Sequence, residues 1–254
     1  MTLLLASPPS FRHLRAVRSR AGGPVLLASG IAWVALGAAT VRDWYGTDES
    51  ASHLHAHSAT VHPWTFGWVT MWLLMVLAMM WPLVVPTLNL VARSSYPRWR
   101  ARLTLTTLAT SSLLWLAFGL GTASVAQVAA VPAGSAWWQL AFLGVAIAAW
   151  RSARRTRLLW KCAKLPPVAP GGRRGVVGAA RAGVVSWQRC GLLCGPVMAA
   201  MAIGHDPVVM VLASLSVWWE ARHPRAWRDK VPLLLLGGAA LWVAGSLVMG
   251  EAVR

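Results

Sequence analysis

Sulfur-containing side chains recur at helical spacing in two apolar stretches of this sequence, WVTMWLLMVLAMMWP and RCGLLCGPVMAAM. The soft ligands in them are Met71, Met75, Met79 and Met80 in the first stretch, and Cys190, Cys194, Met198 and Met201 in the second. Residues four apart lie on one face of an α-helix, so each stretch predicts a stripe of sulfur atoms. Thiolate and thioether together favour cuprous copper, and zinc becomes possible if an imidazole joins them.

The two stripes would have to act together to hold one ion. Residues eight apart on a helix are about 12 Å apart, whereas a metal–sulfur bond is about 2.3 Å long. If the first helix crosses a membrane inward and the second outward, Met79 faces Cys194 and Met75 faces Met198 at similar depths. We therefore expect a metal site, or a short relay of sites, between paired sulfur atoms of the two helices.

Proline stands beside both stripes: Pro82 ends the first stretch, Pro86 lies just beyond it, and Pro196 lies in the second stretch. Proline removes a backbone donor and leaves a carbonyl group without its helical partner. Such breaks are tolerated at membrane depth where the carbonyl groups are buried in protein or line a cavity. The prolines therefore predict kinked helices, which favour a binding site over a plain packing face.

A second candidate site is a histidine-rich segment, ESASHLHAHSATVH. His53, His55 and His57 alternate, so their imidazoles would lie on one side of an extended chain and could bind a cupric or other divalent ion. A polar, solvated loop explains the same composition, because short histidine tracts are compositional evidence only.

Three other functions compete with copper binding. Methionine and cysteine also fill irregular helix interfaces, so the stripes are compatible with a structural or assembly protein that holds no metal. A thiol-redox enzyme would prefer a partly exposed CxxC pair, and CGLLC is one residue longer. A proton-coupled transporter would need acidic groups at span centres, which the apolar stretches lack. We predict no catalytic residues.

The composition gives the fold class. Of 254 residues, 57% are hydrophobic and only 12% are charged, which predicts an all-α, polytopic transmembrane bundle. About seven spans are expected, near residues 24–41, 65–91, 103–130, 136–150, 184–203, 207–219 and 231–249.

The distribution of charge predicts the orientation. The net charge of +17 would suit nucleic acid if it were spread over a soluble protein. Instead, the basic residues gather in the amino-terminal segment 1–23, around Trp99, in the segment 151–183 and before the last span. Because short basic loops stay in the cytoplasm, the amino terminus is expected inside and the histidine segment outside. The expected partner is therefore the lipid bilayer, with basic loops near its anionic surface, and not nucleic acid.

Two motifs resemble a known family. The sequence AMM-x-P, formed by Ala78, Met79, Met80 and Pro82, and the later RCGLLCGPVM with WWEARHP, resemble a bacterial family of predicted metal-binding integral membrane proteins. The chain departs from that pattern at Leu193, where the family often has cysteine, and at Gly195, where it often has tryptophan. The resemblance implies a multi-pass protein of the bacterial inner membrane with a copper-related chaperone or assembly role, and a partner protein that donates or receives the metal.

Overall fold

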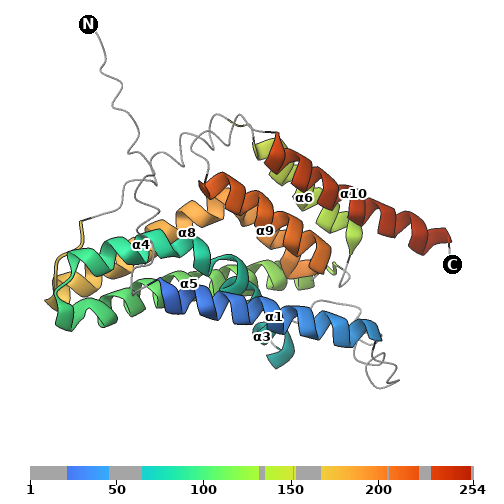
Figure 1. The fold of residues 1–254 in the computed structure, drawn as a ribbon. Helices are drawn as coiled ribbons and strands as arrows, with labels where there is room; N and C mark the ends of the chain where they lie inside the picture. The colour runs from blue at the N-terminus through green and yellow to red at the C-terminus, as the bar shows by residue number, and fades with distance from the viewer. Residues whose placement is uncertain are drawn as a thin grey trace, which may run out of the picture.

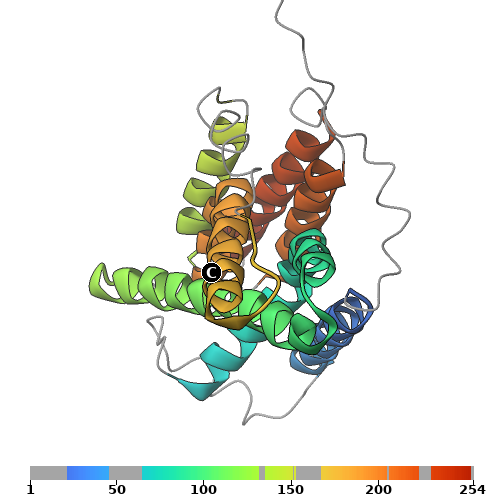
Figure 2. The same ribbon diagram turned by 90° about the vertical axis from the view of Figure 1, so that its left-hand side faces the viewer.

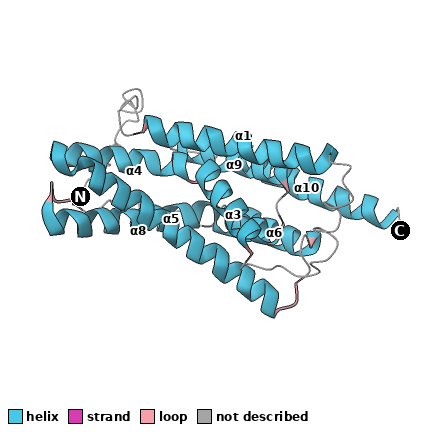
Figure 3. Ribbon diagram, turned by 90° about the horizontal axis from the view of Figure 1, so that it is seen from below, coloured by secondary structure: helices cyan, strands magenta, loops and turns pink. Residues whose placement is uncertain are grey.

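The computed structural model describes residues 22–45, 65–131, 135–150, 152, 167–204, 206–222 and 230–252, and within these ranges every regular element is a helix (Figure 3). The helices are α1 (Gly23–Tyr45), α3 (Phe66–Met79), α4 (Trp81–Ser94), α5 (Pro97–Val128), α6 (Ala136–Trp150), α8 (Gly172–Ile203), α9 (Pro207–Arg222) and α10 (Val231–Ala252). The predicted all-α class is confirmed. The histidine segment and most of segment 1–23 lie outside the described residues.

Helix α8 lies in the middle of the bundle. It packs most extensively against α5 and α6, and also touches α4 and α9, as the end-on view of Figure 2 illustrates. Helix α1 runs along α3 and α4, while α10 lies against α6 and α9 (Figure 1). The second sulfur-bearing stretch therefore belongs to a helix that packs against four others.

The crossing of α5 and α8 is close because Gly183 faces the backbone of α5. A Cβ atom at position 183 would lie 2.6 Å from the Thr107 carbonyl oxygen and 2.9 Å from the Thr110 Cβ. The Thr107 hydroxyl donates a hydrogen bond across this crossing to the Ala179 carbonyl oxygen, at 3.0 Å. Small residues allow helices in a membrane to approach in this way.

Some helices are long and apolar enough to cross a membrane. They are α5 and the Val231–Val248 part of α10, and the bent pair α3 and α4 makes a third if it counts as one span. Only 28% of the apolar window of α5 and 22% of that of α10 are buried in the protein. An apolar surface of this extent has to be covered, by lipid or by another protein. The count of seven spans and the cytoplasmic amino terminus remain predictions.

The largest differences from the predicted boundaries are in three places. The stretch 65–91, expected as one span, is divided at Met80 into α3 and α4, which are bent by 61°. Helix α5 begins at Pro97, before the expected start at 103, and α8 begins at Gly172, inside the expected loop 151–183. The extra turns are rich in Arg and Ala. Both residues favour helix without apolar surroundings, whereas the span prediction counted apolar residues only.

Candidate metal site

Sulfur-containing side chains gather in the largest buried cluster of the protein. Its buried members with sulfur are Met75, Met79, Met80, Cys190, Cys194, Met198, Met201 and Met210, and Met71 packs against it from the side. Seven of the nine methionines in the sequence are in this set, within one core cluster to which seven helices contribute. The eight predicted residues of the two stripes are all brought together here, while His53, His55 and His57 lie outside the described residues.

A direct contact between the two sulfur-bearing stretches joins Cys194 to Met80. The Cys194 Sγ lies 3.6 Å from the Met80 Sδ, and both side chains are fully buried. The thiol also donates a hydrogen bond to the Cys190 carbonyl oxygen, one turn earlier on α8, at 2.9 Å. A thiol and a thioether from different helices are thus held in direct contact, shielded from water.

This spacing fits two ligands of one copper ion. With bonds of about 2.3 Å, sulfur atoms 3.6 Å apart subtend an angle of about 100° at a shared ion. A linear two-sulfur site would need a separation of about 4.6 Å. The observed contact therefore suits a bent arrangement that is completed by further ligands. Met79, Met198 and Cys190 are buried in the same cluster and supply soft donors for those positions.

Cys194 has one partner that the predicted pairing did not include. Met79 was expected to face Cys194, and the structure puts the next residue, Met80, in contact with this thiol. Met80 lies between α3 and α4, outside the four-residue stripe of Met71, Met75 and Met79. Met79 is buried in the same cluster, and its pairing with Cys194 stays a prediction.

The break at Met80 is held by side chains from two other helices. Because Pro82 has no N–H, the Ala78 carbonyl cannot make its usual helical hydrogen bond. It accepts hydrogen bonds from the Ser29 hydroxyl at 2.8 Å and the Trp33 indole at 3.1 Å, both on α1. The Met79 carbonyl accepts one from the Trp218 indole of α9, at 3.5 Å. The bend is therefore fixed in place, and with it the position of Met80.

Tryptophans form one wall of the same cluster. Trp68 and Trp72 stack with ring centroids 5.5 Å apart, and Trp72 donates a hydrogen bond to the Trp115 carbonyl oxygen at 3.0 Å. Trp72 lies flat on Gly119, where a Cβ atom would come within 2.2 Å of the indole. Trp115 in turn meets Trp187 of α8 edge to face. These large rings exclude water from the sulfur atoms, and the low dielectric strengthens any charge pairing among them.

The donor set of this cluster is soft. Within the described ranges, no three His, Cys, Asp or Glu side chains come together in a way that could hold a metal. An ion held here by three side-chain ligands would need methionine, whose thioether suits a soft ion. Sequence reasoning missed Met210 of α9, which is also buried in the cluster. It has no second sulfur at helical spacing, so only the packing of α9 reveals it.

Comparison with known proteins agrees with this donor set. Residues 69–248 match the model of the family PpoB2, described as a copper chaperone. The chain belongs to this copper chaperone family. The resemblance noted in the sequence is confirmed, and so is a role connected with copper. No curated protein and no solved structure shows significant similarity to the chain.

The extent of the match separates the two candidate sites. All nine sulfur residues of the cluster lie between positions 69 and 248, inside the family match. His53, His55 and His57 precede it. Membership in the PpoB2 family therefore bears on the buried sulfur cluster and carries no information about the histidine segment.

Proposed function

We propose that this protein binds cuprous copper as cargo inside a membrane bundle and exchanges it with a partner protein. Met80 and Cys194 are the first two ligands, and a third comes from the buried neighbours Met79, Cys190 and Met198. The observation that carries the proposal is the 3.6 Å contact between a thiol and a thioether of two helices, in a region matched by a copper chaperone family.

Charge balance supports a cuprous ion at this position. A lone charge buried among apolar side chains is costly, so an ion held here needs a counter-charge. When copper binds, the Cys194 thiol loses its proton, and the resulting thiolate neutralises the single charge of the ion. The methionine thioethers then add bonds without adding charge. A cupric ion would need a second thiolate, such as that of Cys190, to balance its charge in the same surroundings.

We further propose that the protein crosses the bacterial inner membrane several times, with about seven spans. Support comes from the apolar faces of α5 and α10 and from the additional short apolar helices Gly23–Ala39, Ala136–Trp150, Cys194–Ile203 and Pro207–Ala221. Exposed side chains such as Leu113, Val125 and Leu241 would meet lipid tails. The basic segments would then lie on the cytoplasmic side.

Reporter fusions test this topology. A reporter inserted at Ser58 is expected to be active on the outer side, and one inserted at Lys164 on the cytoplasmic side, because the basic segment 151–183 resists translocation. The pair is measured with an enzyme that is active only outside and a fluorescent protein that is active only inside. Signals from the same side at both positions would contradict the proposed orientation.

Spectroscopy of the copper-loaded protein tests the site. The purified protein, loaded with cuprous copper without oxygen, is expected to bind about one ion, with two to three sulfur neighbours at about 2.3 Å in X-ray absorption. The variant in which His53, His55 and His57 are all replaced by Ala serves as control and should retain this spectrum. A shell of nitrogen or oxygen, or a copper content near zero, would contradict the sulfur site.

Two other functions make different predictions in the same measurement. A structural or assembly protein without metal would bind no copper and would treat the sulfur cluster as packing. A thiol-redox enzyme would cycle Cys190 and Cys194 through a disulfide. Both thiols are buried and reduced in the structure, which leaves a redox partner little access.

A further inference from the structure

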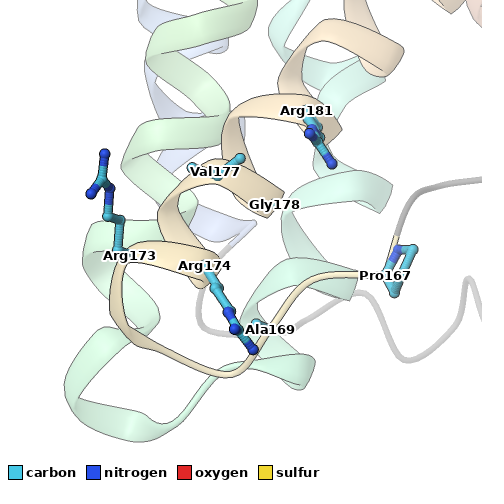
Figure 4. A pocket seen from close by; sticks show the side chains of 7 residues that line it. All are labelled: Pro167, Ala169, Arg173, Arg174, Val177, Gly178 and Arg181. Carbon is cyan, nitrogen blue, oxygen red and sulfur yellow. The ribbon is translucent and has the colours of Figure 1, made fainter.

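A pocket far from the sulfur cluster opens beside the first turns of α8. Its volume is about 560 Å³, within the range of small-ligand sites. It is lined by Pro167, Ala169, Arg173, Arg174, Val177, Gly178 and Arg181. Figure 4 shows Arg174 and Arg181 on the side of α8 that faces the segment 167–171, with Arg173 extending away from them.

The segment 167–171 is fixed against α8 by close backbone contacts. A Cβ atom at Gly175 would lie 2.9 Å from the Ala169 carbonyl oxygen, and one at Gly178 would lie 3.3 Å from the Val168 Cα. The Tyr96 N–H donates a hydrogen bond to the Pro170 carbonyl oxygen at 2.9 Å, which ties the segment to the start of α5. The wall of the pocket is thus built by specific contacts and is not a chance gap.

Three arginines give the pocket a strong positive charge. Arg173, Arg174 and Arg181 fall within about 100° of one another around the helix axis. None of the described residues that line the pocket is acidic. The residue that caps the start of α8, Gly171, provides no side-chain acceptor for the first N–H groups. Guanidinium groups and open helical N–H groups both suit a phosphate oxygen.

We propose that this pocket binds the phosphate group of an anionic membrane lipid. Lipid is favoured over a soluble phosphate because α5, which packs against the first turns of α8, exposes apolar side chains such as Leu105 and Leu113, along which an acyl chain could lie. Val177 and Pro167 add apolar surface to the pocket itself. The inference rests on the membrane placement proposed above, but it does not depend on copper binding.

Lipid binding by charge-neutral variants tests the proposal. The purified protein in a neutral detergent is titrated with phosphatidylglycerol or with phosphatidylcholine, and bound lipid is counted by native mass spectrometry. Arg174→Gln with Arg181→Gln is expected to weaken phosphatidylglycerol binding at least about tenfold, because charge-assisted hydrogen bonds are lost. Arg93→Gln with Arg98→Gln removes the same charge from exposed positions outside the pocket and should change it by about threefold or less.

Three outcomes would overturn this assignment. Equal losses in the two double variants would mean attraction to general surface charge. Equal affinity for the two lipids would remove the requirement for a net anion. If inorganic phosphate binds with the same arginine dependence and lipid binds no more tightly, the ligand is a free phosphate. Copper content should stay unchanged in the pocket variants, and lipid binding should stay unchanged in Cys194→Ser, so the two sites can fail separately.

Discussion

Replacing Cys194 with serine is expected to remove cuprous copper from the protein. The hydroxyl is a harder and much weaker ligand than thiolate, and it supplies no negative charge to balance the buried ion. Affinity should fall at least about a hundredfold, so that copper measured by mass spectrometry after anaerobic loading approaches zero. The fold should persist, because the serine hydroxyl can donate to the Cys190 carbonyl oxygen as the thiol does now.

Two control variants decide whether this loss reflects coordination. Cys162→Ser removes a cysteine outside the described residues and should leave the copper content unchanged. Met198→Leu keeps nearly the same volume in the cluster and should weaken binding less than Cys194→Ser, because a thioether is one of several neutral ligands. A packing role predicts another result, in which no variant changes the copper content and Cys194→Ser changes only the stability.

Replacing Gly183 with alanine is expected to destabilise the bundle strongly. The added methyl group would lie 2.6 Å from the Thr107 carbonyl oxygen, which is backbone and cannot rotate away. Helices α5 and α8 would have to separate, at a cost of about 3 kcal/mol. In a protein of this size that corresponds to a melting temperature lower by about 10 °C, measured in detergent by circular dichroism.

Gly191→Ala is the matched control on the same helix. A Cβ atom at position 191 meets no other atom within 4 Å. Since alanine favours helix over glycine, this variant should melt at the same temperature or slightly higher. Equal destabilisation by the two variants would show that the loss comes from helix propensity and not from the crossing of α5 and α8.

The sequence alone determined the all-α class and the location of the soft ligands. Hydropathy depends on local composition, so it located the apolar helices. For α6 the predicted span 136–150 has the same first and last residues as the helix, Ala136–Trp150. The four-residue period put sulfur atoms on common helix faces, and those residues are buried together. Of the prolines expected to kink helices, Pro82 lies at the observed break, whereas α4 continues through Pro86 and α8 through Pro196.

Only the tertiary structure decided which sulfur atoms meet. The 61° bend between α3 and α4 occurs at Met80, which contacts Cys194, and the bend is held by the side chains of Ser29, Trp33 and Trp218. The inclusion of Met210 depends on how α9 packs, which no spacing within α9 reports. The periodicity of one segment shows which face of its helix carries the sulfur atoms. It does not show which other helix packs on that face, because helix packing depends on both partners.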